Sequence, residues 1–266
     1  MNLLGKSGTE LVKLVEKKEL SKTEVVEYFQ KRIKKYNSKL NCYVTVVSEV
    51  KEGIPISIKD NFCTKGIRTS ASSKVLDGFV PQYESAVTKR LLENDYSILG
   101  KTNMDAWAHG SSTETSDYGP TKNPWDISRV AGGSSGGSAA AVSSYLSPWA
   151  IGSETAGSIR GPASWCGLVG LKPTYGRVSR YGVIAMGSSL DCPGPLTRTV
   201  EDAALLLSLI AGKDPYDATT SQNPVEDYQN SLQLKKRLTI GIPEEYFEGC
   251  DKETAKKVNA ALEVIK

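Results

Sequence analysis

Hydrophobic residues recur at helical spacing near the start of the chain. Two groups share this spacing: Leu11, Val12, Leu14 and Val15, and then Val25, Val26, Phe29 and Ile33. Between them, Ser21 and Glu24 match the capping box that begins a helix, in which each side chain accepts a hydrogen bond from the other residue's backbone N–H. The pattern predicts a helical hairpin over residues 8–36.

Beyond this hairpin, short apolar runs alternate with helical patterns. Strands are expected at residues 53–58 (GIPISI), 96–99, 149–152 and 237–242 (RLTIGI). Helices are expected at residues 85–93, 103–108, 135–145 and 199–211, and from residue 251 onward. Thr199 can cap the start of its helix and Gly212 can stop it. The alternation predicts an α/β fold, with the polar residues 214–233 as a surface excursion.

The composition is that of a globular protein without an obvious surface for polyanions. The 266 residues are 39% hydrophobic, which allows a large core, and 33 basic residues nearly balance 30 acidic ones, for a net charge of +3. Five cysteines without a C-x-x-C pair indicate a reducing compartment and argue against disulfides or zinc. Neither a membrane-spanning run nor a signal peptide is visible, so we expect a cytoplasmic location and no membrane contact.

Two clusters rich in glycine and serine, residues 132–138 and 152–158, stand out in the middle of the chain. Flexible linkers have a similar composition, but these glycines are interleaved with large apolar residues such as Trp149 and Trp165. The clusters therefore predict a backbone that bends closely around a site.

Several kinds of serine chemistry compete for these clusters. Gly132-Gly133-Ser134-Ser135-Gly136 formally matches the G-x-S-x-G nucleophile elbow, which requires a histidine later in the chain. The only histidine, His109, comes earlier, so a triad could form only in another order, with Asp117 or Asp126. The S-x-x-K motif at Ser48 lacks its companion motifs, and no nucleotide-phosphate fingerprint follows the glycines.

A serine without a histidine can use a buried lysine as its base. Lys59 is the best candidate because it ends an apolar strand, although a lysine at a strand end is more often exposed. The second cluster can supply an oxyanion hole, since Thr155, Ala156, Gly157 and Ser158 form a tight turn whose N–H groups converge beside a helix start. The residues thus predict a Ser/Lys acyl-transfer enzyme.

The chain resembles the amidase signature family in GGSSGGSAAAV, in GSETAGSIRGPASWCGLVGLKPTYGRVSRYG and in GIPISIKDNF. The resemblance implies a single amidase domain over residues 1–266, with a mixed central β-sheet between layers of α-helices and an N-terminal helical hairpin. It also implies Ser158 as the acyl-forming serine, Ser134 as the bridging serine after a cis Gly133-Ser134 bond, and Lys59 as the catalytic lysine.

Within that family, three stretches are similar to the A subunits of tRNA-dependent glutamyl/aspartyl amidotransferases: KTNMDAWAHGSSTETSDYGPTKNPWD, SSLDCPGPLTRTVEDAALLLSLIAGKDPYD and IGIPEEYF. This resemblance implies a glutamine-hydrolysing subunit of a heterotrimer that passes ammonia to a B subunit, beside a C subunit. ATP and Mg²⁺ would act in the B subunit, tRNA would be met only through the complex, and this chain would hold no cofactor. The alternatives are a free-standing amidase acting on small amides and a catalytically incomplete scaffold.

The chain departs from the family pattern T-G-G-S-I-R-Q at two positions, where Ala156 and Gly161 replace a glycine and the glutamine. Alanine would be strained at position 156 if the turn required a positive φ there. Family members are also much longer than 266 residues, so we expect the chain to be incomplete at its C-terminus and to lack the residues that grip glutamine's α-carboxylate and α-amine.

Overall fold

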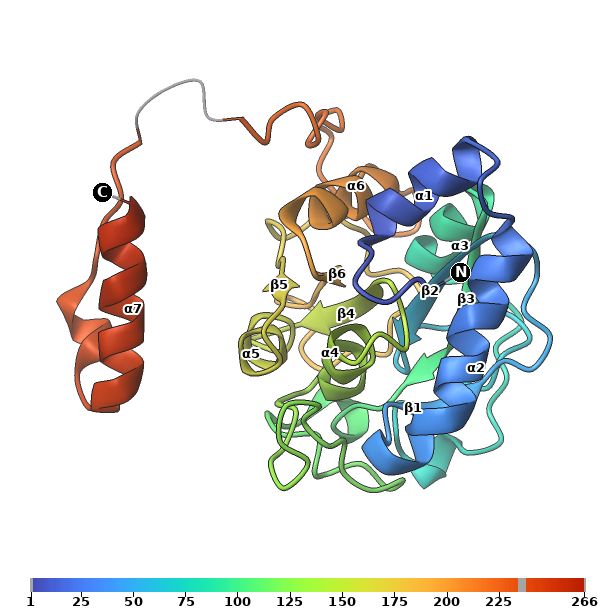
Figure 1. Cartoon of the computed structure of the whole chain (residues 1–266), viewed down its shortest axis with the longest axis horizontal. Coiled ribbons are helices and arrows are strands. Elements are labelled where there is room, and N and C mark those ends of the chain that lie inside the picture. Colours follow the sequence, from blue (N-terminus) through green and yellow to red (C-terminus); the bar gives the residue numbers. More distant parts are fainter. Residues whose placement is uncertain (1, 234–237, 266) are drawn as a thin grey trace. The chain divides into compact units, whose positions relative to one another are not determined.

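A six-stranded mixed β-sheet between layers of helices forms the larger part of the protein (Figure 1). The computed structural model describes residues 2–233 and 238–265. Their contacts separate two compact units, residues 1–232 and residues 233–266, and the sheet lies in the first. The α/β prediction is confirmed, and the single domain over residues 1–266 stays a prediction.

The sheet has the strand order β1-β3-β2-β4-β6-β5. The strands are β1 (Tyr43–Val46), β2 (Ile54–Lys59), β3 (Tyr96–Thr102), β4 (Ala150–Glu154), β5 (Val169–Gly170) and β6 (Cys192–Thr197). The three central strands, β3, β2 and β4, are parallel, whereas β1, β6 and β5 each pair antiparallel with their neighbours. The expected strands at residues 53–58, 96–99 and 149–152 are thus confirmed as β2, β3 and β4.

In the described part of the first unit, α-helices cover this sheet: α1 (Gly8–Glu16), α2 (Lys22–Leu40), α3 (Ala86–Glu93), α4 (Gly136–Ser143), α5 (Arg160–Trp165) and α6 (Val200–Ile210). Helices α2 and α4 contact the sheet in one layer, and α3 and α6 pack together in the other. Each layer has its own core of buried apolar residues, one around Phe29 and Leu99 and one around Ile56 and Trp149. The sheet is therefore covered on both faces, as the apolar content of β2 requires.

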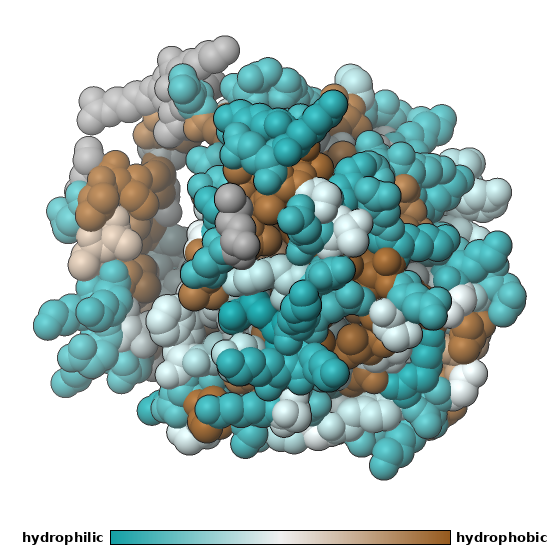
Figure 2. All heavy atoms as spheres, turned by 45° about the vertical axis from the view of Figure 1, so that its right-hand side comes forward, coloured by the Kyte–Doolittle hydropathy of each residue, from teal (hydrophilic) through white to brown (hydrophobic). Residues whose placement is uncertain are grey.

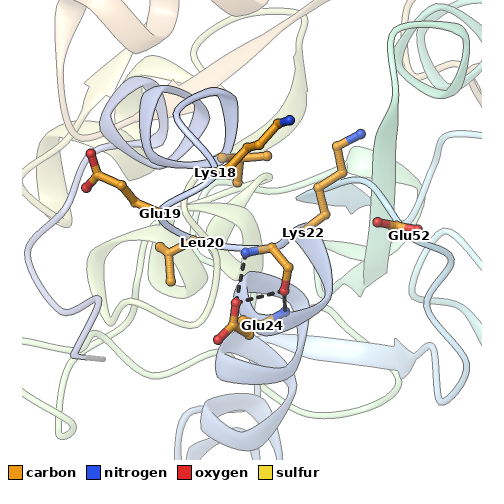
Figure 3. A pocket seen from close by; sticks show the side chains of 8 residues that line it. Lys18, Glu19, Leu20, Lys22, Glu24 and Glu52 are labelled. Atoms are coloured by element: carbon orange, nitrogen blue, oxygen red, sulfur yellow. Dashed lines mark hydrogen bonds between the residues drawn. The ribbon is translucent and has the colours of Figure 1, made fainter.

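The helical hairpin predicted for residues 8–36 is formed by α1 and α2 (Figure 1). Ser21 and Glu24 make the expected capping box, and Ser7 and Glu10 make a second one at the start of α1. Figure 3 shows the corner between the helices, where eight residues line a pocket of about 380 Å³. Its charged residues carry both signs and Glu24 is engaged in the cap, so this corner stabilises the hairpin.

The segment that follows β3 is less helical than expected. Residues 103–108 contain only the 3-10 turn η2 (Ala106–Ala108), in which Trp107 has a positive φ of 57°. Buried polar side chains explain the difference. The hydroxyls of Ser72 and Ser116 both donate to Asn103 Oδ1, and these contacts replace the local hydrogen bonds of a helix. A second 3-10 turn, η1 (Lys74–Leu76), precedes α3.

The second unit contains the 3-10 turn η3 (Glu244–Phe247) and helix α7 (Lys252–Ile265), which confirms the helix expected from residue 251. The strand expected at residues 237–242 is wrong for residues 238–242, which have no regular structure, and Arg237 lies outside the described residues. Leu238, Ile240 and Ile242 are exposed there, and without a neighbouring strand their backbone groups gain no ladder bonds.

On the face drawn in Figure 2, hydrophilic side chains predominate and hydrophobic ones occur in small scattered groups. Within residues 2–233 and 238–265, no helix combines the length and apolar character needed to span a membrane.

Candidate active site

The predicted site residues gather where the central parallel strands end. Lys59 is the last residue of β2, Thr102 of β3 and Glu154 of β4. In an α/β sheet, the carboxyl ends of parallel strands meet at one edge, which is where such folds bind ligands. The connections that follow β3 and β4 bring both glycine clusters to this edge.

Lys59 is completely buried at the end of β2. Its Nζ donates to Ser134 Oγ at 2.7 Å and to the carbonyl of Ser153 at 3.1 Å. Burial lowers the pKa of Lys59 to about 7, against the opposing effect of the carboxylates of Asp105, Asp191 and Glu154. The buried strand-end lysine predicted from the sequence is confirmed, and the exposed alternative is wrong. A lysine whose pKa is lowered toward neutrality can act as a general base.

Ser134 lies between the bend of the first cluster and helix α4, and it is completely buried. The expected cis peptide bond between Gly133 and Ser134 is present. Position 133 requires glycine, because a Cβ there would lie 2.7 Å from the backbone nitrogen of Ser112 as well as 2.1 Å from Asp105 Oδ2. The backbone N–H of Asp105 also donates to the Ser134 carbonyl at 3.2 Å, so Asp105 holds this bend on both sides.

Ser158 lies in the turn between β4 and α5, beside Ser134. Its carbonyl accepts a hydrogen bond of 3.1 Å from the backbone N–H of Ser135. Ser158 is 8% exposed, whereas Lys59 and Ser134 are 0% exposed. Of the three predicted catalytic residues, Ser158 is therefore the one that a substrate can reach.

The turn that carries Ser158 is organised by Glu154. The carboxylate of Glu154 accepts from the backbone N–H groups of Ile159 and Arg160, each at 3.0 Å, and from the Arg160 guanidinium. Burial alone would raise the pKa of Glu154, but these hydrogen bonds hold it below its ordinary value. The backbone from 155 to 158 is thus closed into a loop anchored at both ends.

The N–H groups of this loop are available for an oxyanion. Among the hydrogen bonds of the described chain, none uses the N–H of Ala156, Gly157 or Ser158. Gly157 has a positive φ of 143°, whereas Ala156 does not have a positive φ. The strain considered for alanine at position 156 therefore does not arise, because the unusual conformation falls on the neighbouring glycine.

The start of the loop is tied to a segment far along the chain. Thr155 Oγ1 donates to Asp191 Oδ1 at 2.5 Å, and Asp191 also accepts from the backbone N–H groups of Met186 and Gly187. Sequence reasoning missed Asp105, Glu154 and Asp191, all of which are buried. An acidic residue at the end of an apolar strand was a usable signal for Glu154, but nothing local marked the other two.

The competing triad is not formed. His109 is bonded through Nδ1 to the carbonyl of Trp107, Asp117 accepts from Ser73 and Lys74, and Asp126 accepts from Ser128 and Arg129. The histidine and both candidate aspartates of this triad therefore have separate partners. The S-x-x-K motif lies in an exposed loop between β1 and the start of β2, not at the carboxyl ends of the central strands.

Gly161 leaves space beside the first cluster. A Cβ at position 161 would meet only the carbonyl oxygen of Gly133, at 3.8 Å. Position 161 therefore has room for a side chain beside the first cluster. Among the described residues, no group of three His, Cys, Asp or Glu side chains could hold a metal ion.

Four of the five cysteines are buried. All five are unpaired and only Cys250 is partly exposed. Burial raises the pKa of the Cys166 thiol to about 12 and that of Cys42 further still. The four buried ones, Cys42, Cys63, Cys166 and Cys192, act as small buried residues, as the sequence predicted, whereas Cys250 does not.

Comparison with known proteins gives a family and close relatives. A family model described as Amidase matches residues 49–266. The chain is 50% identical to the A subunit of glutamyl-tRNA(Gln) amidotransferase from Persephonella marina (strain DSM 14350 / EX-H1), in an alignment covering 100% of this chain and 59% of that protein.

Solved structures agree with this result. The A subunit of glutamyl-tRNA(Gln) amidotransferase from Thermotoga maritima is 43% identical, with a TM-score of 0.80 over 84% of this chain and 50% of that one. The native peptide amidase from Stenotrophomonas maltophilia is 34% identical, with a TM-score of 0.79 over 86% of this chain and 53% of that one. The predicted amidase signature fold is confirmed, and the chain spans between 50% and 59% of the length of these three relatives.

Proposed function

Because the chain belongs to the amidase family, we propose that it hydrolyses the side-chain amide of glutamine through an acyl-enzyme on Ser158. The observation that carries the proposal is the hydrogen bond of 2.7 Å between Lys59 Nζ and Ser134 Oγ, made by a buried lysine whose pKa is lowered to about 7. A neutral amine held on a serine hydroxyl can remove a proton from it without a histidine.

In the first step, Ser158 Oγ attacks the carbonyl carbon of the amide. Its proton passes to Ser134 Oγ while the Ser134 proton passes to Lys59 Nζ, so that the lysine becomes an ammonium. The negative charge that develops on the carbonyl oxygen is stabilised by the free N–H groups of the loop from 155 to 158. Gly157 and the helix start that follows give this loop its bend.

In the second step, the tetrahedral intermediate collapses. The proton on Lys59 returns through Ser134 to the amide nitrogen, the carbon–nitrogen bond breaks, and ammonia leaves. Water then attacks the ester on Ser158, with Lys59 again as the base, and releases glutamate. In both steps the proton passes through the Ser134 hydroxyl. This role fits the burial of Ser134 and its hydrogen bond to Lys59.

We propose that the ammonia is used by partner subunits. The curated relative of 50% identity is named as the A subunit of an amidotransferase for glutamyl-tRNA(Gln). On that basis the chain acts in the cytoplasm with B and C subunits, and ATP and Mg²⁺ act in the B subunit, where the misacylated tRNA, Glu-tRNA(Gln) or Asp-tRNA(Asn), is transamidated. The net charge of +3 supports a chain that meets tRNA only through its partners.

A second candidate function is a free-standing amidase. The similarity to a peptide amidase and the open space beside Gly161 favour this alternative. The two functions share the chemistry of Lys59, Ser134 and Ser158 and differ only in substrate and partners. Glutamine hydrolysis that depends on added partner subunits supports the first, and turnover of small amides by the chain alone supports the second.

The experiment that tests the shared chemistry is labelling with a fluorophosphonate probe, which reacts with an activated serine by forming an oxygen–phosphorus bond and releasing fluoride. We expect the label on Ser158 of the full 266-residue chain, located by peptide mass spectrometry. Ser158→Ala is expected to abolish it, with Ser164→Ala, at an exposed serine of α5, as the matched control. An unlabelled Ser158 in folded wild-type protein would mean that the chain is an inactive scaffold.

A further inference from the structure

A second lysine is completely buried near the site, and the proposed chemistry does not use it. Lys101 lies on β3, next to β2, and is 0% exposed like Lys59. In the parallel register, Lys101 pairs with Ile58, whereas Lys59 pairs with Thr102. Neighbouring residues of a strand point to opposite faces, so the two lysines extend from opposite faces of the sheet.

The contacts of Lys101 differ from those of Lys59. Its Nζ donates to the carbonyl of Phe62 at 2.6 Å and to Thr69 Oγ1 at 2.7 Å, and it lies 3.7 Å from Asp60 Oδ1. Two of the three N–H donors of the ammonium are used in these hydrogen bonds, and the Asp60 carboxylate, at 3.7 Å, is an ion-pair partner beyond hydrogen-bond distance. Burial lowers the pKa of Lys101 to about 8, while Asp60 acts in the opposite direction. Lys101 is thus arranged as an ion-paired cation.

Asp60 is equally buried and is the residue directly after Lys59. Its Oδ2 accepts from the hydroxyl of Ser70 at 2.5 Å and from the N–H groups of Ser70 and Ser72, at 3.1 Å and 3.0 Å. Its Oδ1 has no hydrogen bond among the described residues and faces only Lys101. The Asp60 carboxylate therefore joins the loop at residues 70–72 to Lys101.

Backbone hydrogen bonds and Lys101 together close the turn that follows Lys59. The N–H of Phe62 donates to the Lys59 carbonyl at 3.1 Å, and the N–H of Asp60 donates to the Thr102 carbonyl at 3.1 Å. Lys101 holds the other end of this turn through the Phe62 carbonyl. One ammonium thus fastens both the residue after Lys59 and the residue that completes its turn.

We propose that Lys101, paired with Asp60, is a positioning residue that fixes the turn after Lys59 and thereby keeps Lys59 Nζ on Ser134. The inference rests on the proposed function, since it concerns the base of that reaction. Lys101 does not touch the substrate or exchange a proton with it. Its effect is geometric, and catalysis is sensitive to displacements of about 1 Å.

The test compares the rate of Ser158 labelling by the fluorophosphonate probe with the melting temperature, in the full chain. Lys101→Met leaves the Asp60 carboxylate buried and unpaired, so we expect both a lower melting temperature and at least tenfold slower labelling. The double variant Asp60→Asn/Lys101→Met removes the unpaired charge. We expect it to recover most of the melting temperature while labelling stays at least tenfold slow. Lys89→Met, at an exposed lysine of α3, is the control.

A second pair of variants keeps the charges in place. Thr69→Val removes the hydroxyl that accepts from Lys101 with little change of volume, and Thr69→Ser retains it. We expect slower labelling in Thr69→Val, by about threefold to tenfold, and near wild-type labelling in Thr69→Ser. This pair remains informative if the Lys101 variants do not fold.

The outcomes separate this inference from the proposed function. Labelling that recovers together with the melting temperature in the double variant, or that is equal in Thr69→Val and Thr69→Ser, overturns the positioning role. Wild-type protein that is folded but unlabelled at Ser158 overturns the proposed function and, with it, the positioning role of Lys101.

Discussion

The pH dependence of Ser158 labelling is a direct test of Lys59 as the base. Only neutral Lys59 can take a proton from Ser134, and its pKa is about 7. The neutral fraction is then about 1% at pH 5, about 50% at pH 7 and about 99% at pH 9. We therefore expect the second-order rate constant of labelling to rise about 100-fold from pH 5 to pH 9, with its midpoint near pH 7.

The measurement is gel-based labelling at a series of pH values, with near-ultraviolet circular dichroism at each pH to show that the fold is unchanged. Lys59→Arg serves as the control, since it keeps a cation and removes the base, and it should label slowly at every pH. A wild-type rate that is constant from pH 6 to pH 9, or that still rises tenfold per unit above pH 9, would refute a base with a pKa near 7.

The carboxylates around Lys59 also predict the direction in which the midpoint of this pH dependence should move when one of them is removed. Asp105 is the strongest of the three that oppose the effect of burial on Lys59. Asp105→Asn removes a negative charge that favours the ammonium, so the pKa of Lys59 should fall and the midpoint should move to lower pH. The midpoint is independent of how much protein is active, so a loss of stability in Asp105→Asn does not obscure the sign. A midpoint that moves upward would contradict the assignment.

Three further predictions follow from the same geometry. Ser134→Ala should slow labelling of Ser158 by about 100-fold to 10,000-fold, measured as above, because the proton route is broken; a loss below tenfold would argue against it. Lys59→Met should abolish labelling yet raise the free energy of unfolding at pH 7 by a few kcal/mol in urea titration, since Lys59 has its ordinary pKa near 10.5 in the unfolded chain, which therefore binds more protons. Lower stability would contradict this. Gly157→Ala should cost about 1 kcal/mol and slow labelling, because φ there is 143°, whereas Gly161→Ala in α5 should do neither; equal effects would show that the loop tolerates a side chain.

The elements that could be predicted from the sequence are those whose signals are local. The capping box at Ser21 and Glu24, the apolar run of β2 and the cap at Thr199 depend on residues a few positions apart, and each element formed as expected. The strand predicted at residues 237–242 is wrong for residues 238–242, because a strand is stabilised by hydrogen bonds to a neighbour that is often distant in sequence. Its apolar pattern alone could not supply that neighbour.

The site shows the same division. Lys59 could be found because a lysine ending a buried strand is unusual, and the glycine clusters could be found by their composition. Asp191 could not, since its relation to Thr155 joins residues 36 positions apart and exists only after folding. The roles of Ser134 and Ser158 came from the family resemblance, and the structure adds that only Ser158 retains any exposure.

The two buried lysines show why residue type and burial are insufficient to assign a base. Both are fully buried, both end or nearly end a central strand, and burial lowers both pKa values. Lys101 has a carboxylate at 3.7 Å and donates two hydrogen bonds, so protonation is favoured by direct contacts. Lys59 contacts a hydroxyl and one carbonyl, and the hydroxyl can reverse its role and donate to a neutral amine. Lys101 also contacts a hydroxyl, but Thr69 is completely buried and donates to the carbonyls of Phe62 and Ile67. The difference is that the hydroxyl on Lys59 lies beside Ser158, which is 8% exposed.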